Sequence, residues 1–256
     1  MSKLFKGNVT NNVVELNLLD PAGTPTIVTK NTGANVVEQI VGDIPANYYA
    51  SGSNGGYDVK GLVIGTSCTS IGDLAFYDCR SLTGNLVIPD SVTSIGSYAF
   101  YFGFGLTGSL TIPDSVTSIG SYAFNNCIGL TGSLVIPDSV TTIGDYGFDM
   151  GLGGDSWSGP LTIGNSVTSI GSSAFFYCTG FNGSLTIPNS VTSIGSFAFN
   201  GCSSITSVSI LATTAPTIGS NAFSSMTSVS PAEIHVPVGA TGYAASYDGL
   251  TVVYDL

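Results

Sequence analysis

The chain has 256 residues, enough for one or two ordinary domains or for a single repeat array. Only 8% of the residues are charged and the formal net charge is −11, so the chain lacks the clustered Lys and Arg with which proteins bind nucleic acids or acidic lipid surfaces. Its apolar residues are scattered in twos and threes, without the roughly 18-residue run of a membrane-spanning helix, so we expect no membrane insertion.

Residues 1–60 contain three strand-like runs. In the first, Val14, Leu16 and Leu18 alternate with polar residues, as in a half-exposed strand, and the runs PTIVTK and NVVEQIV follow. The run SGSNGG at residues 51–56 resembles a flexible joint. No apolar stretch of about 7–15 residues follows the first lysines, so the pattern is not that of a secretory signal. We interpret residues 1–60 as an N-terminal β cap or, alternatively, as a docking segment that attaches the chain to a larger assembly such as a virion.

A pattern of 24 residues recurs between residues 61 and 230. It is marked by phenylalanines that lie 24 residues apart except for one step of 27, namely Phe76, Phe100, Phe124, Phe148, Phe175, Phe199 and Phe223. About seven tiers can be counted. The three extra residues of the longer step lie in the run DMGLGGDSWSG, which we interpret as an insertion at one edge.

Residues 109–132 form the clearest tier. Leu110 and Ile112 alternate with a threonine, which is the period of a strand, and Pro113 ends that strand because it has no backbone N–H to donate. Gly120 permits a bend before the next inward pair. The remaining apolar positions are Val116, Ile119, Ala123, Phe124, Cys127 and Leu130. A single tier cannot bury this stripe, whereas stacked tiers can, so the pattern predicts a β-rich repeat solenoid about 35 Å long.

The repeat resembles the BspA-type (treponemal) leucine-rich repeats in the run L-x-I-P-x-S-V-T-x-I-G-x-x-A-F-x-x-C-x-x-L. This run is nearly intact at residues 86–106, 110–130, 134–150 and 185–205. The resemblance covers about residues 61–230 and implies a leucine-rich-repeat array with caps at both ends. Residues 231–256 look like the family's terminal cap, an I-x-V-P strand followed by a last strand. Members of the family look like surface proteins that bind host proteins, other cells or glycans, and none of the family's defining residues is catalytic.

Two features that suggest chemistry have simpler explanations. The run GFGLTG at residues 103–108 matches a dinucleotide-binding pattern, but its counterpart one tier later is CIGLTG, so the repeat explains it without a cofactor. His235 is the only histidine, and its flanking Ile234 and Val236 turn it toward solvent. No Ser, Cys or carboxylate is tied to it by a recognisable spacing. We therefore expect no catalytic triad, no cofactor and no enzymatic activity.

The cysteines also follow the repeat. Four of them share one repeat position, whose other occupants are glycines: Cys79, Cys127, Cys178 and Cys202. We predict a column of small buried thiols. A disulfide between Cys178 and Cys202 in adjacent tiers is the alternative, and Cys68, outside the column, has no assigned role.

Asp90, Asp114 and Asp138 stack at one turn position that continues as Asn165 and Asn189. Such residues hydrogen-bond locally in turns, and we favour this interpretation. The alternative is a carboxylate column that binds calcium.

Tyr98, Tyr122 and Tyr146 form a further column, continued by Ser173 and Phe197. The inward positions beside them already belong to the Ala-Phe pairs, so these rings are candidates for the surface. They either pack on one another along a ridge or contact a ligand. Together with Phe197 and Trp157 of the insertion, the three tyrosines are our candidate ligand-binding residues.

Threonines form a last column beside a column of serines and threonines: Thr93, Thr117, Thr141, Thr168 and Thr192. Their hydroxyls either decorate a solvent-facing β surface or form an array that binds ice or a glycan.

We conclude that the sequence encodes a non-enzymatic adhesion module whose broad β face binds a protein or glycan on another surface. A bacteriophage tail, a virion or an extracellular surface would suit it, and a cytoplasmic location stays open. The rival hypothesis is a structural spacer or decoration protein that contacts only its own assembly.

Overall fold

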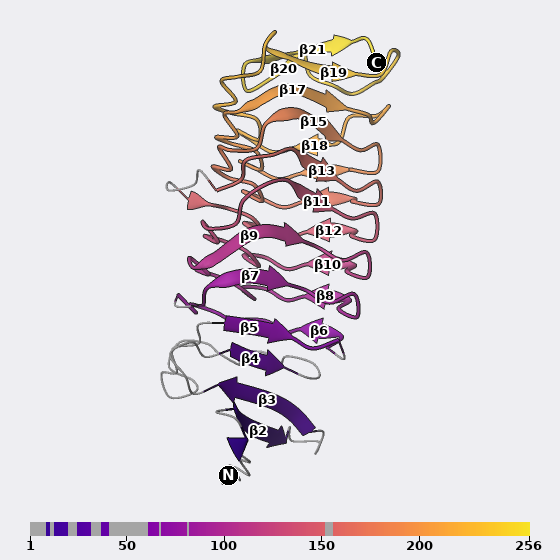
Figure 1. Ribbon diagram of the computed structural model, residues 1–256. Helices are drawn as coiled ribbons and strands as arrows, with labels where there is room; N and C mark the ends of the chain where they lie inside the picture. Colours follow the sequence, from indigo (N-terminus) through magenta and orange to yellow (C-terminus); the bar gives the residue numbers. More distant parts are fainter. Residues whose placement is uncertain are drawn as a thin grey trace.

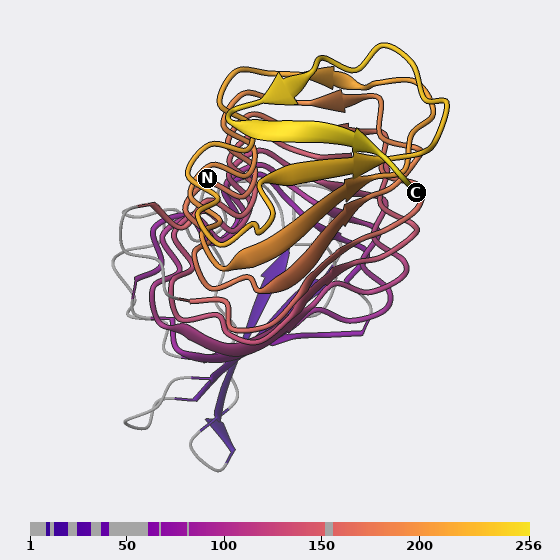
Figure 2. The same ribbon diagram turned by 90° about the horizontal axis from the view of Figure 1, so that it is seen from above.

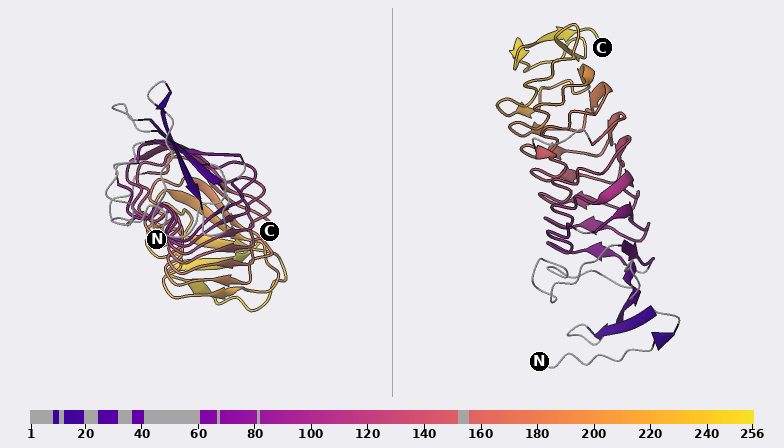
Figure 3. Two further views of the ribbon diagram at one scale, coloured as in Figure 1. Left: turned by 90° about the horizontal axis from the view of Figure 1, so that it is seen from below. Right: turned by 60° about the vertical axis from the view of Figure 1, so that its left-hand side comes forward.

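The computed structural model of the protein shows a solenoid in which successive tiers stack along one axis, with the N-terminal strands at one end and the C-terminus at the other (Figures 1 and 3). The structure describes the backbone of strands β1 (Val9–Thr10), β2 (Val13–Leu19), β3 (Pro25–Asn31) and β4 (Val37–Ile40), and residues 61–66, 68–80, 82–151 and 156–256. The predicted β-rich array of about seven tiers is confirmed. No helix within these described residues is long and apolar enough to cross a membrane.

One side of the solenoid carries a parallel strand from each tier, and Figure 2 looks along the axis at these strands following one another. They are β5 (Gly61–Ile64), β7 (Gly84–Val87), β9 (Leu106–Thr111), β11 (Leu134–Ile136), β13 (Leu161–Ile163), β15 (Gly183–Ile187), β17 (Ile205–Ile210), β19 (Glu233–Val236) and β21 (Leu250–Tyr254). Leu134 and Ile136 pair with Leu161 and Ile163, so equivalent side chains lie over one another. We call this side the large sheet face.

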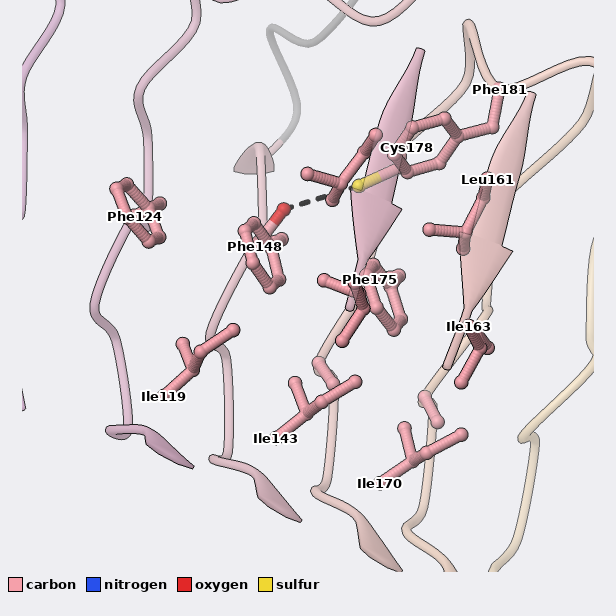
Figure 4. Packing of buried hydrophobic residues seen from close by; sticks show 14 of the residues in the cluster. Ile119, Phe124, Ile143, Phe148, Leu161, Ile163, Ile170, Phe175, Cys178 and Phe181 are labelled. Atoms are coloured by element: carbon pink, nitrogen blue, oxygen red, sulfur yellow. Dashed lines mark hydrogen bonds between the residues drawn. The ribbon is translucent and has the colours of Figure 1, made fainter. Parts of the chain in front are cut away.

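A second side is a seven-stranded parallel sheet of two-residue strands, which lie in chain order. They are β6 (Ser70–Ile71), β8 (Ser94–Ile95), β10 (Ser118–Ile119), β12 (Thr142–Ile143), β14 (Ser169–Ile170), β16 (Ser193–Ile194) and β18 (Thr217–Ile218). Their isoleucines point inward: Ile119, Ile143 and Ile170 form a regular row in Figure 4.

The third side has turns in place of strands, and backbone hydrogen bonds between tiers hold it. In the first tier the N–H groups of Leu74, Phe76 and Asp78 donate to carbonyl oxygens of the next tier at 2.7–2.8 Å. The residue two before each buried phenylalanine has a left-handed backbone, with φ between 53° and 60° in all seven tiers. Such a conformation costs a non-glycine residue about 1 kcal/mol, which the regular ladder between tiers offsets.

The phenylalanines predicted to lie inside form a continuous stack along the core, and Phe124, Phe148 and Phe175 are three of its members in Figure 4. Successive ring centroids are 5.1–5.7 Å apart, with planes within 12° of parallel. This column shows why each tier keeps a phenylalanine at the same place in its turn, even across the 27-residue step from Phe148 to Phe175, where the rings still stack at 5.4 Å.

Glycine occupies the position of Gly120 in each tier for a reason other than the bend that the sequence predicted. Its backbone does not lie in the left-handed region. A Cβ atom at Gly120 would instead lie 2.5 Å from the backbone nitrogen of Ser97, and one at Gly195 would lie 2.3 Å from that of Ser172. Close approach of neighbouring tiers therefore demands glycine here.

The Ser-Val-Thr run of each tier hydrogen-bonds to the tier before it. The Ser115 hydroxyl donates to the carbonyl oxygen of Val92 at 2.6 Å, and the Thr117 hydroxyl donates to that of Thr93 at 3.1 Å. Thr93, Thr141, Thr168 and Thr192 repeat the second contact. Each of these threonine hydroxyls thus donates to a partner within the protein while its side chain stays exposed, and the interpretations as a plain β surface or a binding array remain predictions.

Both ends of the array carry further strands. The N-terminal strands form one sheet in the order β1-β2-β3-β4-β5, antiparallel up to β4, which pairs in parallel with β5. At the other end β20 (Ser246–Tyr247) pairs antiparallel with β21 and leaves a two-residue edge. The cap and docking interpretations of residues 1–60 remain predictions, and the proposed joint at residues 51–56 lies outside the described residues.

Candidate functional site

Three of the predicted surface residues come together on the turn side. Tyr98 and Tyr122 stack with ring centroids 4.5 Å apart and planes at 6°, and Tyr122 and Tyr146 stack at 4.6 Å and 9°. All three are partly exposed, whereas the residues that follow them are buried. The column therefore lies on the surface and its rings pack on one another, as the ridge interpretation predicts, while contact with a ligand remains a prediction.

A second row of tyrosines interlocks with the first. Tyr77 and Tyr101 stack at 5.0 Å and 6°. Tyr101 also places an edge against Tyr98, at 5.3 Å and 68°, and against Tyr122, at 6.1 Å and 73°. Sequence reasoning missed this row, although its members lie 24 residues apart. We call Tyr77, Tyr98, Tyr101, Tyr122 and Tyr146 the tyrosine ridge.

Two phenols of the ridge, those of Tyr101 and Tyr122, are held in their protonated form. Burial raises the pKa of Tyr101 and Tyr122, and neighbouring tyrosines add to this effect. At neutral pH these groups are therefore neutral hydroxyls, able both to donate and to accept hydrogen bonds.

A cation marks the end of the ridge nearer the N-terminus. The Arg80 guanidinium carbon lies 5.1 Å from the ring centroid of Phe102 and 5.4 Å from that of Phe104, while its Nε atom pairs with Asp78 at 2.6 Å. The ring centroids of Tyr101 and Phe102 lie 4.0 Å apart. Arg80 is the only Lys or Arg in residues 61–256. The rest of the ridge consequently presents a surface without basic groups.

The column of rings changes beyond Tyr146. Ser173 occupies the next position and is 5% exposed, and Phe197 follows with 38% exposure. Phe197 makes one ring contact among the described residues, an edge contact with Phe176 at 6.5 Å. Phe197 is thus on the same surface as the tyrosines but separated from their stack.

Trp157 does not belong to this surface, and the prediction that it faces a ligand is wrong. It is 1% exposed and stacks on Phe181 with centroids 5.2 Å apart. The insertion turns its tryptophan into the core, where burial of a large ring is favourable.

The aspartate column behaves as a set of turn residues. Asp90, Asp114 and Asp138 are exposed, and the Asp138 carboxylate accepts the backbone N–H of Asn165 at 2.6 Å. Across the described part of the chain no three His, Cys, Asp or Glu side chains gather closely enough to hold a metal ion. The three aspartates therefore do not form a set of ligands for calcium in the described structure.

The predicted column of buried thiols is confirmed for Cys127, Cys178 and Cys202, whereas Cys79 is only partly buried. Each thiol donates to the carbonyl oxygen of a phenylalanine in the preceding tier at 3.1–3.2 Å, and Figure 4 shows the bond from Cys178 to Phe148. Burial raises the pKa of Cys127 and Cys202 to about 12. Cys178 and Cys202 are both free, so the alternative of a disulfide is wrong.

A buried polar pair interrupts the second row of the ridge. Asn125 and Asp149 occupy the positions after Tyr101, and the Asp149 carboxylate accepts hydrogen bonds from the Asn125 amide at 2.8 Å and from the Gly151 N–H at 2.7 Å. Burial raises the pKa of Asp149, and the two hydrogen bonds oppose that shift. The pair anchors the start of the insertion and is too enclosed to contact a ligand directly.

His235 has partners that the sequence did not indicate. Its Nδ1 atom lies 2.9 Å from both carboxylate oxygens of Asp255, and its Nε2 atom lies 3.9 Å from Glu233. No Ser or Cys hydrogen-bonds to it among the described residues. The run GFGLTG leads into strand β9 and not into a helix, which is the wrong context for a dinucleotide site.

Comparison with protein families matches six copies of the BspA type leucine rich repeat region to residues 54–151 and 159–245. Two solved structures share the fold. A leucine rich cell surface protein from Faecalibacterium prausnitzii is 24% identical, with 90% of this chain and 76% of that chain covered and a TM-score of 0.51. A leucine rich repeat protein from T. pallidum is 20% identical, with 88% and 92% covered and a TM-score of 0.53. Comparison with curated proteins gave no match.

Proposed function

Because the chain belongs to the BspA-type leucine-rich-repeat family, we propose that it is a non-enzymatic adhesion module that binds a protein or glycan on another surface through its tyrosine ridge. The single observation that supports this proposal most is the ridge itself. The solenoid core is complete without it, since Ala and Phe fill the inward positions of the same turns.

The ridge has the physical properties of a binding surface. Tyrosine offers a large ring and a hydroxyl with few rotatable bonds, which is why it is enriched among the residues that dominate binding energy. The stacks and edge contacts between Tyr98, Tyr101 and Tyr122 hold these rings before any ligand arrives. Binding then loses little side-chain entropy, so more of the contact energy is left for affinity.

The double variant Tyr98→Ser/Tyr122→Ser tests the proposal, with attachment to cells, immobilised proteins and glycans as the measurement. Val87→Ser/Val135→Ser is the matched control, because both valines are exposed on the large sheet face. We expect the tyrosine variant to lose attachment by about tenfold or more while circular dichroism shows a folded protein. If the tyrosine variant attaches as well as the control, the proposal that the tyrosine ridge is the binding surface is contradicted.

The same measurement separates adhesion from a spacer or decoration role. A chain that attaches to no protein, cell or glycan, yet binds a partner particle through residues 1–60, would be a structural component.

We further propose display on an outer surface, either extracellular or on a virion such as a bacteriophage tail. Support comes from the composition, in which 8% of residues are charged, and from an array suited to presenting one long face. Labelling of intact particles and cells with an antibody tests this location, and a signal confined to the cytoplasm would contradict it.

A further inference from the structure

A row of polar residues with a carboxylate at each end runs beside the tyrosine column. In four successive tiers, one residue directly precedes the position of that column, and these residues are Asp73, Ser97, Ser121 and Asp145. Both aspartates are exposed. Because three tier steps at strand spacing separate them, they lie about 14 Å apart along the solenoid.

Both carboxylates are held in place by hydrogen bonds within the protein. The Oδ1 atom of Asp73 accepts the backbone N–H of Ser97 at 2.6 Å, and that of Asp145 accepts the N–H of Ser172 at 2.7 Å. A carboxylate has room for about four hydrogen bonds, so each group keeps acceptor capacity for a donor that arrives from solvent. Since these side chains are already ordered, binding a donor costs them little entropy.

The charge of the neighbouring carboxylates reaches the ridge itself. Burial is the main cause of the raised pKa of Tyr122, and the Asp145 carboxylate is a smaller one that acts in the same direction. Burial also comes first in raising the pKa of Tyr101, to which Asp149 and Asp78 contribute less. These carboxylates disfavour a further negative charge at the ridge, and the same Coulomb interaction favours a positive one.

No free basic side chain of the array balances this charge. Arg80 is the only Lys or Arg in residues 61–256, and its Nε atom pairs with Asp78 at 2.6 Å. Its guanidinium also lies over the rings of Phe102 and Phe104, at the end of the ridge nearer the N-terminus. With a formal net charge of −11 on the chain, an acidic partner would be repelled, and charge complementarity favours a basic one.

The outward groups of the ridge also suit a basic partner. Tyr98, Tyr122 and Tyr146 stack face to face, so neighbouring rings cover one another's faces and a ligand meets ring edges and hydroxyl groups. A phenol oxygen accepts hydrogen bonds from the N–H groups of Lys and Arg. The long aliphatic stems of Lys and Arg pack on apolar surface while their charged ends reach a carboxylate. One such side chain therefore contacts both a ring and an aspartate.

We propose that the tyrosine ridge binds a basic segment of a partner protein, whose Lys or Arg side chains pair with Asp73 and Asp145 while the rest of the segment packs on the tyrosines. An extended segment rises about 3.3 Å per residue, so basic residues about four positions apart span the two aspartates and point to the same face. The inference rests on the adhesion function proposed above and names the class of partner.

The test measures binding of the full chain to immobilised peptide pools of equal length, which carry Lys, Gln or Glu at every second position and mixed residues between. Asp73→Asn/Asp145→Asn removes both charges, and each asparagine keeps an oxygen for the backbone N–H, so this variant is expected to fold. Asp114→Asn/Asp138→Asn is the matched control. These carboxylates are exposed where strands β9 and β11 end, and Asp138 accepts the N–H of Asn165 at 2.6 Å in the same way.

We expect the Lys pool to bind about tenfold or more tightly than the Gln pool, and the Glu pool to bind most weakly. Asp73→Asn/Asp145→Asn should weaken binding of the Lys pool about tenfold, while the control stays within about threefold. A Lys pool that binds no better than the Gln pool would overturn the inference, as would an aspartate variant no weaker than its control. A preference for the Glu pool that Arg80→Gln abolishes would also overturn it, because Arg80 would then be the binding group.

The ridge variant distinguishes this inference from the adhesion proposal. If Tyr98→Ser/Tyr122→Ser loses attachment to cells or glycans while no basic peptide binds, the ridge stands and the inference about its partner fails. If the Lys pool depends on Asp73 and Asp145 but binds the tyrosine variant equally well, the choice of a basic partner stands and the ridge fails.

Discussion

The Asp149 carboxylate accepts a hydrogen bond of 2.8 Å from the side-chain amide of Asn125 in the preceding tier, and both side chains are buried. Burial raises the pKa of Asp149 in the folded protein, so folding favours its protonated form. The stability that this group contributes is fully present below its unfolded pKa and is lost as the pH rises through the folded pKa.

We therefore expect the free energy of unfolding of the natural protein to fall relative to that of Asp149→Asn as the pH rises from about 4, the ordinary pKa of an aspartate, through the raised pKa of Asp149. The variant also loses an acceptor, but that effect does not vary with pH, so the slope is the informative quantity. Urea unfolding at several pH values measures it, with Asp114→Asn as an exposed control. A pH-independent difference for Asp149→Asn would be inconsistent with a raised pKa.

The hydroxyl of Ser115 makes a partly buried bond between tiers, and its loss should be measurable. We expect Ser115→Ala to lower the free energy of unfolding by about 1 kcal/mol because the carbonyl oxygen of Val92 loses its donor. Ser133→Ala, at an exposed serine, should change it by less than about 0.5 kcal/mol. Equal effects in urea denaturation would show that the bond does not stabilise the array.

Gly120 and Gly183 are glycines for two different reasons, close contact between tiers at Gly120 and a left-handed backbone at Gly183. Gly183 has φ of +75° with open space around its Cα, so Gly183→Ala should cost about 1–2 kcal/mol of backbone strain. Gly120→Ala should cost about 3 kcal/mol or more, because the new methyl group meets the backbone of the preceding tier. Chemical denaturation of both variants compares the two effects, and a smaller cost at Gly120 would disprove the close approach.

The buried thiols should resist modification in the folded state. With pKa values of about 12 for Cys127 and Cys202, almost no thiolate exists at pH 8, and burial also excludes the reagent. We expect mass spectrometry after treatment with a thiol reagent to find both unmodified until urea unfolds the protein. Ser133→Cys, an exposed thiol, should react at once. Rapid modification of Cys127 in the native protein would refute its burial.

The fold was predictable because the residues that build it repeat. Ile119, Phe124 and Cys127 lie inside, since one tier's pattern recurs in its neighbours and a stripe of such side chains can only be buried by stacking. The sequence predicted a bend at Gly120, whereas the glycine is needed because the preceding tier approaches closely. The residues of a single tier do not reveal such an approach.

The candidate site was only partly predictable. The Tyr98 column follows the repeat, whereas the second row depends on how rings of adjacent tiers interlock, so Tyr77 and Tyr101 were missed. Trp157 was misplaced because the insertion breaks the period that told inward from outward positions. The contact between His235 and Asp255 joins strand β19 to the residue that follows β21 in the terminal cap, where there is no repeat to compare.

The most direct test of the adhesion proposal is the dissociation constant for the attached surface, measured for the natural protein and for Tyr98→Ser/Tyr122→Ser under identical conditions. We predict a constant raised about tenfold or more by the double substitution, with folding retained and with Val87→Ser/Val135→Ser unchanged. A constant that the tyrosine substitutions leave unchanged would contradict the assignment of the tyrosine ridge as the binding surface.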